Sequence, residues 1–510
     1  MIRKILLFAV LLMILELPAL AQKIVYSEYD KNDTRSMNFE IAGKIKGNYL
    51  IYKNNRSNKH IISILDEEMK EISTAEQDFL PSNDKIINVD FFPYADFCYM
   101  IYQYQKKNVV YCMAAKIDGN GKKMGEIQEL DTTHLGFALN NKIYTVLSSE
   151  DKSRIIVFKI NTRNKRLYAI TTNLLNEKLE LQKKSNLKIQ MDDRNEYLTD
   201  FQLDNQGDLV FSKFFRNNND IISKASMMIK HSHADSIQEN ALNIEKTLLD
   251  EIHIKVDNPN KRYILMSYYF KERRGNIEGF YFYVWDKTLQ KTSMENTTVF
   301  TEELRKEAKG EASVKTAFND FFIRNIITRK DGGFIIGSES YYTTSRFNNW
   351  NRWDYLYGAP YMNSYNNNYY SPYYNNYWWS SRVNSNQAVR YHADNLVVLS
   401  FNNKGEQEWS NVISKSQFDD QSDDLVSYQL VNTGGQIHFL FNLQEKRYNL
   451  LTDYTLSPDG QLNRNPTLKN LDKGYEFMPK YGKQVSSRQM IIPCQYRNYI
   501  CFAKVDYTQN

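Results

Sequence analysis

Cysteine is scarce in this chain, and the sequence motifs of the common enzyme classes are missing. Four of the 510 residues are cysteine, and no C-x-x-C pair occurs, which argues against a zinc knuckle and a thiol redox enzyme. No G-x-S-x-G, H-E-x-x-H, Walker or dinucleotide-binding motif is present. We therefore predict no catalytic residue, no metal ligand and no cofactor, although an enzyme that assembles its site from scattered loops stays open.

Apolar runs long enough to cross a membrane are also missing. The run Ile5–Ile14 is too short for a bilayer core of about 30 Å, which needs roughly 20 apolar residues. It follows Arg3 and Lys4 and precedes Ala19-Leu20-Ala21, which is the order of a secretory signal peptide. We predict a signal peptide over residues 1–21, cleaved after Ala21, and export to the periplasm or the extracellular space with no transmembrane anchor in the mature chain. A buried N-terminal strand is the alternative.

Charge of one sign is not concentrated anywhere. The formal net charge is +5, and the lysines are dispersed along the chain, so nucleic acid is not an expected partner. Aromatic residues, by contrast, make up 14% of the chain and include 37 tyrosines. Tyrosine favours strands because its ring packs well on a pleated, half-buried surface.

The four cysteines lie in two local pairs. A two-residue turn at Arg497-Asn498 would place Cys494 opposite Cys501. Cys98 and Cys112 also lie in two successive apolar runs, with a less definite alignment. An oxidising compartment permits disulfides, and we predict the local pairing Cys98–Cys112 and Cys494–Cys501. Four buried free thiols are the alternative.

Pairs of strand-like runs separated by polar turns recur about eight times along the chain. The first and second runs of each pair are Asn48–Tyr52 and Ile61–Leu65, Phe97–Tyr104 and Val109–Ile117, Lys142–Leu147 and Ile155–Ile160, Asp208–Phe214 and Ile221–Ile229, Arg262–Phe270 and Gly279–Trp285, Gly333–Ser338 and Leu396–Phe401, Gln436–Phe441 and Leu450–Leu456, and Gln489–Gln495 and Tyr499–Val505. Units of three or four strands with this recurrence predict an all-β fold, a β-propeller, with eight blades favoured and seven possible. We expect one domain over 22–510, in which the N-terminal strand Lys23–Glu28 completes the last blade. A pair of β-sandwiches is the alternative.

One stretch resembles a known family. Residues 326–337 contain Asp331-Gly332-Gly333, and Asp394–Trp409 contains an Asp-strand-Gly-x-x-x-Trp pattern that ends in Gly405 and Trp409. Both are similar to the blade turns of secreted bacterial β-propeller repeat proteins. The resemblance covers about 322–468 and implies a fold rather than an activity.

A Tyr/Asn/Trp-rich insertion, 341–392, interrupts one blade motif. It has almost no aliphatic residues, so we predict a long loop. Its candidate ligand-binding residues are Trp350, Trp353, Tyr369, Tyr370, Tyr373, Tyr374, Trp378 and Trp379. Flat rings stack on sugars and amides pair with hydroxyls, so a glycan or an envelope protein is the expected partner. Self-association and an inert insertion are alternatives, and nothing in the sequence indicates an oligomeric state.

Four further segments were considered. His231-Ser232-His233-Ala234-Asp235 would form a metal-binding face on a strand but is better explained as a hairpin tip. The acidic run Asp419–Asp424 and the turn Asp118–Lys122 are typical of solvated turns, with calcium as the alternative for the former. Thr301–Lys309 predicts a short surface helix capped by Thr301.

Taken together, these features favour an exported, non-catalytic binding or scaffold protein of the cell envelope that makes contact through the aromatic loop. The alternative is a carbohydrate-active or peptidase-type propeller enzyme with acidic residues drawn from several loops.

Overall fold

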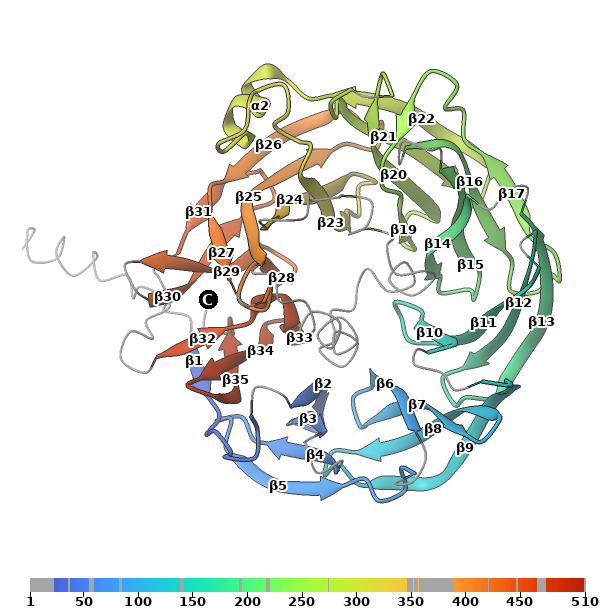
Figure 1. The fold of residues 1–510 in the computed structure, drawn as a ribbon, viewed down its shortest axis with the longest axis vertical. Coiled ribbons are helices and arrows are strands. Elements are labelled where there is room, and N and C mark those ends of the chain that lie inside the picture. The colour runs from blue at the N-terminus through green and yellow to red at the C-terminus, as the bar shows by residue number, and fades with distance from the viewer. Residues whose placement is uncertain are drawn as a thin grey trace, which may run out of the picture.

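The computed structural model describes residues 23–34, 37–54, 59–81, 85–137, 142–164, 166–191, 195–216, 221–273, 275–345, 352, 356, 389–420, 422–445, 448–465 and 474–508. The predicted signal peptide, 1–21, lies outside these residues. Antiparallel strands dominate the described residues and are arranged as a ring of small sheets (Figure 1). The fold is a β-propeller, and a pair of separate sandwiches is not what the chain forms.

Seven hydrogen-bonded sheets are present among the described residues. One of them has nine strands and contains two consecutive four-stranded meanders joined by β18 (Leu248–Leu249). Counted in this way, the strands of the described residues make eight units of four or five strands around the ring. Within the first seven units, each strand pairs with the next one along the chain, as expected for blades built from hairpins.

The units run in sequence order. Units 1 and 2 are β2 (Asn38–Ile45), β3 (Asn48–Asn54), β4 (His60–Leu65), β5 (Glu71–Glu76), and β6 (Lys85–Pro93), β7 (Phe97–Lys106), β8 (Val109–Asp118), β9 (Lys123–His134). Units 3 and 4 are β10 (Tyr144–Ser148), β11 (Arg154–Asn164), β12 (Leu167–Asn176), β13 (Leu181–Gln190), and β14 (Glu196–Leu203), β15 (Leu209–Arg216), β16 (Ile222–Lys230), β17 (Gln238–Ala241).

Units 5 and 6 are β19 (His253–Asp257), β20 (Arg262–Phe270), β21 (Gly279–Asp286), β22 (Lys291–Val299), and β23 (Phe321–Thr328), β24 (Phe334–Ser345), β25 (Val389–Phe401), β26 (Gln407–Ile413), with β27 (Gln417–Asp419) added to β25. Unit 7 is β28 (Tyr428–Asn432), β29 (Ile437–Glu445), β30 (Tyr448–Leu456) and β31 (Leu462–Arg464). Unit 8 is β32 (Tyr475–Phe477), the 3-10 helix η1 (Pro479–Tyr481), β33 (Lys483–Ser486), β34 (Gln489–Tyr496), β35 (Tyr499–Asp506) and β1 (Lys23–Tyr26).

The hydrophobic core is divided between neighbouring units. Eight of the buried clusters each combine residues from two consecutive units, and the last of these joins unit 8 to unit 1. Tyr52 of unit 1 packs on Phe91 of unit 2, for example, at 5.4 Å between ring centroids. Each sheet therefore depends on its neighbours to remove its apolar faces from water, which is the dominant stabilising term in such a ring.

The ring closes as the sequence predicted. β1 pairs antiparallel with β35 from Lys23 opposite Asp506 to Tyr26 opposite Ala503. The first described residues thus supply the outer strand of the last unit, which hides an edge that β35 would otherwise expose.

The short helix is also confirmed. α2 (Glu302–Ala308) begins after Thr301, whose side chain accepts a hydrogen bond from the Leu304 amide, and it buries Leu304 and Ala308. The N-cap bond satisfies one of the free amides at the start of the helix.

Two glycine turns make contacts between units, and the first of them belongs to the Asp331–Gly333 motif of the family resemblance. Gly332 has a φ of +85° and its carbonyl accepts a hydrogen bond from Arg262 of unit 5. Gly460 has a φ of +87° and lies against the Trp409 ring, at a place where a Cβ atom would come within 2.8 Å of that ring. A side chain at either glycine would therefore strain the backbone.

The cysteine predictions have different outcomes. All four cysteines are buried free thiols. Cys494 lies directly opposite Cys501, with 3.3 Å between the sulfur atoms. The Cys98–Cys112 pairing is wrong, because Cys98 faces Ile117 and Cys112 faces Gln103 in the β7–β8 ladder. This register places the two thiols on opposite faces of the sheet, in different clusters.

Under oxidising conditions we expect Cys494 and Cys501 to join, because a small movement brings their sulfur atoms to the roughly 2.05 Å of a disulfide bond. Cys98 and Cys112 should stay reduced. Alkylation of the denatured, unreduced protein followed by peptide mapping checks this. Alkylation of all four cysteines after exposure to oxygen would contradict it.

Candidate functional site

The eight aromatic residues predicted to bind a ligand lie outside the described residues, but both ends of their insertion and two residues within it, Arg352 and Leu356, are described. β24 and β25 continue as a ladder from Tyr341 opposite Ala393 to Ser345 opposite Val389. β27 pairs with β25 along Tyr391–Ala393 and widens this part of the sheet. We call residues 341–345, 389–393 and 417–419 the stem.

The stem has a small apolar core of its own. Its buried members are Phe322, Tyr341, Tyr391, Ala393 and Val426, with Leu356 and Val389 packed against them. Leu356 therefore ties a residue inside the insertion to the body of unit 6.

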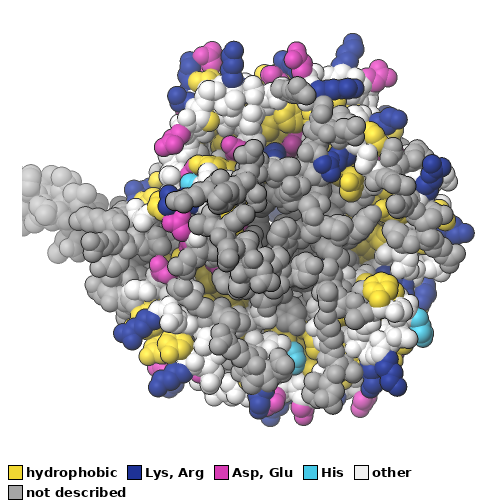
Figure 2. All heavy atoms as spheres, in the orientation of Figure 1, with side chains coloured by type: hydrophobic (Ala, Val, Ile, Leu, Met, Phe, Trp, Pro, Cys, Tyr) yellow, Lys and Arg dark blue, Asp and Glu magenta, His cyan; other side chains and the backbone are white. Residues whose placement is uncertain are grey.

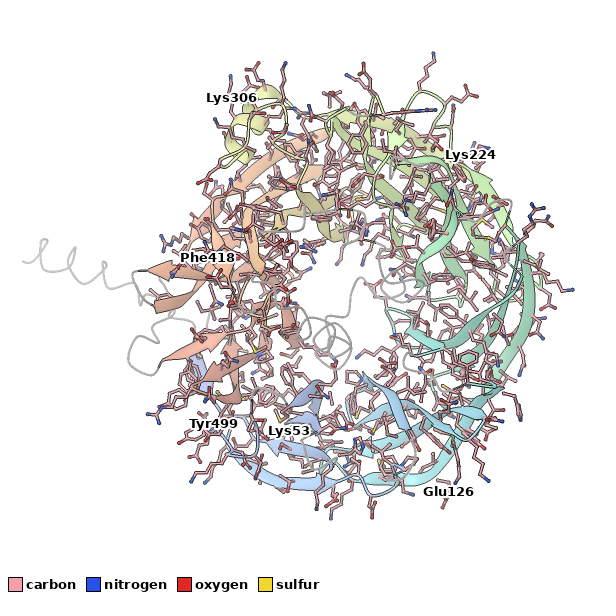
Figure 3. All side chains as sticks on the ribbon, in the orientation of Figure 1. Lys53, Glu126, Lys224, Lys306, Phe418 and Tyr499 are labelled. Atoms are coloured by element: carbon pink, nitrogen blue, oxygen red, sulfur yellow. The ribbon has the colours of Figure 1, made fainter. Side chains whose placement is uncertain are left out.

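The surface of the stem carries aromatic and charged side chains. Tyr342 and His392 stack at 4.5 Å between ring centroids, and burial lowers the pKa of His392. Arg390 pairs with Asp420 at 2.6 Å, and its guanidinium lies 4.5 Å from the centroid of the Phe418 ring. Phe418, labelled in Figure 3, is 46% exposed. Exposed large apolar residues beside aromatic and charged groups are typical of contact surfaces.

Arg352 lies in a buried acidic pocket between units 5 and 6. A guanidinium nitrogen is 2.7 Å from Asp250 Oδ2, and another contact of 3.4 Å reaches Glu251 Oε1. The guanidinium carbon lies 3.9 Å from the centroid of the Phe322 ring. We call Arg352, Asp250, Glu251 and Phe322 the Arg352 clamp. A planar cation stacked on a ring and paired with two carboxylates is held in position as well as neutralised.

Glu251 connects the clamp to three units. Its Oε2 atom is 3.0 Å from His253 Nε2, and its Oε1 atom accepts a hydrogen bond of 2.7 Å from the Ile323 amide. The other ring nitrogen of His253 is 4.0 Å from Asp200 Oδ2 in unit 4. This one carboxylate therefore contacts groups of units 5 and 6 and, through His253, faces unit 4.

Burial disfavours the charged form of each of these groups. The charges and hydrogen bonds beside each group then decide whether its pKa is raised or lowered. The hydrogen bond from His253, its charge and that of Arg352 outweigh burial at Glu251 and lower its pKa. Burial lowers the affinity of His253 for a proton, but the hydrogen bond and charge of Glu251 outweigh it, so the pKa of His253 is raised. At Asp250 burial dominates and the pKa is raised despite Arg352.

The raised pKa of His253 predicts a pH dependence of stability. Its stabilising contribution is complete below the ordinary value of 6.5 and is lost as pH rises through the higher pKa of the folded state. The difference in free energy of unfolding between the wild type and His253→Gln should therefore shrink from pH 6 upward. Urea unfolding between about pH 6 and pH 9 measures it. A difference that stays constant would contradict the prediction.

The base of the stem rests on a second buried ion pair. Lys415 Nζ and Glu339 Oε1 are 2.8 Å apart, and both side chains are fully buried. Arg324 Nε is 3.3 Å from Glu339 Oε2, to which Ser427 also donates a hydrogen bond of 2.5 Å. Buried charges of this kind are tolerated only when paired, and they fix the geometry of the elements that carry them.

The other sequence candidates lie elsewhere. His231 contacts Asp208 and Gln238, and Asp235 pairs with Lys183. Within the acidic run, Asp420 pairs with Arg390, Asp423 with Lys480 at 2.8 Å, and Asp424 accepts from Tyr481 at 2.6 Å. Asp118 accepts the amides of its own turn. Over the described parts of the chain, no group of three or more His, Cys, Asp or Glu is arranged to hold a metal ion.

Sequence reasoning missed the Arg352 clamp. Its signals were the adjacent acids Asp250-Glu251 at the start of a blade and an arginine within an aromatic stretch that has few charged residues. The partners are about 100 residues apart in sequence. Only the ring brings them together.

Figure 2 shows the face of the ring seen in Figure 1, where basic and acidic side chains of the described residues are interspersed around the rim. A surface of mixed sign does not point to a polyanionic partner. Among the described residues, no helix has the length and apolar character to cross a membrane.

Comparisons with known proteins find only remote similarities. No protein-family model matches the chain, and no curated protein matches its sequence. Among solved structures, the WD40 domain of SCAP from fission yeast is similar at 8% identity and a TM-score of 0.40, over 95% of this chain and 98% of that one. The Dos1 propeller is similar at 9% and 0.40, over 93% and 94%.

The β-propeller domain of the Trilobed protease from Pyrococcus furiosus is similar at 11% identity and a TM-score of 0.37, over 84% of this chain and 95% of that one. Similarities this remote carry no argument about activity. The resemblance to secreted bacterial repeat proteins stays a prediction, and what the chain shares with these structures is the β-propeller fold.

Proposed function

We propose that this chain is an exported, non-catalytic binding or scaffold protein of the cell envelope, and that the aromatic insertion on unit 6 is its contact surface. The observation that carries this is the Arg352 clamp. Buried charged contacts are formed by an arginine that belongs to the insertion itself and not to the blade.

The clamp and the stem hold the insertion at several points. Ser345 and Val389 are directly opposite one another, so the two ends are closed, and Arg352 and Leu356 fix the first part of the segment. The described residues on either side of 357–388, Leu356 and Val389, are therefore held against unit 6. Fixed ends lower the entropy that is lost when a surface between them binds its partner.

The composition of the insertion indicates the class of partner. Tyrosine and tryptophan supply large rigid contact areas, and asparagine supplies adaptable hydrogen bonds. An envelope glycan or an envelope protein fits these groups. The alternative enzyme would need carboxylates available to a substrate, whereas Asp250, Glu251 and Glu339 are each paired with a buried cation.

The test separates the contact surface from its support. A variant that lacks 357–388, bridged by a short Gly-Ser linker, keeps Arg352 and Leu356 and should fold. It should lose co-sedimentation with purified cell-wall sacculi, or cross-linking to envelope protein in intact cells, whichever the wild type shows. Arg352→Ala should weaken the same binding with the aromatic segment still present.

Exchange of Lys59 with Glu76 on unit 1 is the matched control, since it keeps an exposed ion pair away from the insertion and should leave binding unchanged. Full binding by the deletion variant would overturn the proposed function.

A further inference from the structure

Five tyrosine rings form a continuous row on unit 8. Tyr26 stacks on Tyr475 at 4.6 Å between centroids, Tyr475 contacts Tyr496 at 4.9 Å, and Tyr29 contacts Tyr496 at 5.4 Å and Tyr499 at 5.1 Å. The rings come from β1, the segment after it, β32, β34 and β35. We call this row the tyrosine ladder; Tyr499 is labelled in Figure 3, near the outer edge of the ring.

The ladder lies on a rigid support. β34 and β35 form a hairpin whose turn begins at Arg497 with a φ of +57°. The buried thiols of Cys494 and Cys501 lie in the same sheet, two residues along β34 from the ring pair Tyr475–Tyr496. At the outer end, Tyr29 is 42% exposed. The sheet therefore holds the rings in place, and the row is exposed to solvent at the end where Tyr29 lies.

The hydroxyl groups of the ladder are not used within the fold. Among the described residues, none of the five hydroxyls forms a hydrogen bond, and that of Tyr26 is buried without a partner. Burial raises the pKa of Tyr475 to about 12, so its hydroxyl is a neutral donor. The Tyr26 hydroxyl is shielded from solvent, so a ligand rich in hydroxyls would meet the more exposed members of the ladder, such as Tyr29.

The electrostatics select a neutral ligand. Among the described residues, Arg497 is the cation whose contact with a ladder ring is seen, with its guanidinium 5.3 Å from the centroid of the Tyr496 ring. Two carboxylates or several cations, which recognition of a charged ligand requires, are not present among these contacts. Flat ring faces, free phenol hydroxyls and little charge match the apolar faces and hydroxyl rims of sugar rings.

From these contacts we propose that the tyrosine ladder is a second binding site, for a neutral glycan chain, independent of the insertion on unit 6. The β34–β35 hairpin joins the second and third strands of unit 8, as the insertion does in unit 6. Because the units repeat around the ring in the same direction, both sites open on the same face.

The test uses isothermal titration of the purified protein with linear neutral pentasaccharides of glucose, xylose and N-acetylglucosamine. At least one of them should bind. Tyr29→Ala should weaken that binding at least 10-fold, equivalent to about 1.4 kcal/mol, and Tyr29→Phe should weaken it less. Tyr111→Ala, which removes one ring of the stacked Tyr104–Tyr111 pair of unit 2, is the matched control and should bind as the wild type does.

Several outcomes would overturn the inference. These are binding of none of the three sugars at millimolar concentration, equal binding by Tyr29→Ala and wild type, or binding of a proline-rich peptide by the ladder in place of a sugar. Circular dichroism confirms that each variant is folded. The variant lacking 357–388 should keep the glycan affinity of the wild type, which separates failure of this site from failure of the insertion.

Discussion

Replacing Glu251 by alanine is expected to lower the free energy of unfolding by about 3–5 kcal/mol, the usual result of removing one member of a buried charged network. The substitution leaves His253 and Arg352 in a buried place with fewer opposite charges. It also leaves the Ile323 amide without its acceptor. Urea or guanidinium unfolding at pH 7 measures the loss.

The matched control is Glu126→Ala. Glu126 is exposed on the outer strand β9 (Figure 3) and its replacement should change stability by less than about 0.5 kcal/mol. Glu251→Gln should fall between the two, because the amide keeps an acceptor for Ile323 but loses the charge. Equal stability of Glu251→Ala and Glu126→Ala would show that the clamp does not join the units.

A chain that starts at Glu28 instead of Gln22 is expected to lose about 4 kcal/mol of stability, from about 0.5–1.5 kcal/mol for each lost hydrogen bond plus the apolar contacts of β1. Ile24 and Tyr26 pack against the cluster between units 7 and 8, and Val25 packs against the one between units 8 and 1. Without them β35 becomes an exposed edge, so the truncated chain should also self-associate.

Thermal unfolding and light scattering of the two chains, at equal concentration, check this prediction. Ile24→Ala in the longer chain is the graded control and should lose only a part of the stability, because the β1–β35 ladder remains. A truncated chain that unfolds at the wild-type temperature and stays monomeric would show that closure by β1 is dispensable.

The strands that sequence reasoning recognised best are the middle strands of the units. β3, β7, β20, β24, β29 and β34 were each found as the first apolar run of a pair, and the run that follows each of them is the third strand of its unit. These strands are covered on both faces, so they read as continuous apolar segments. The outer strand β22, KTSMENTTV, is largely exposed and carries no such signal.

In unit 3 the predicted pair of runs lies one strand earlier than in the other units. The predicted runs there are β10 and β11, the first and second strands, and the third strand β12 was not recognised. Its sequence, LYAITTNLLN, contains four polar residues at positions that the fold buries or half-buries. Local composition cannot reveal that a neighbouring unit covers such residues.

The two cysteine pairs also differ in how well the local sequence predicts which residues face each other. The two-residue turn at Arg497-Asn498 fixes the register of the β34–β35 hairpin, and so Cys494 faces Cys501. In the β7–β8 hairpin the strands extend to Lys106 and Val109 around a shorter turn than the sequence suggested. In the observed register Cys98 faces Ile117 and Cys112 faces Gln103.

The amino-acid sequence was enough to predict the class of fold, a spare strand at Lys23–Tyr26, the helix capped by Thr301 and the position of the aromatic insertion, because each depends on patterns within a few neighbouring residues. The pairing of the spare strand with β35 followed only from the missing last strand of unit 8. Only the tertiary structure decided that Arg352 is paired with Asp250 and Glu251, and that five tyrosines from both ends of the chain meet on unit 8. Such contacts join residues that are far apart along the chain, and no local pattern encodes the geometry of a closed ring.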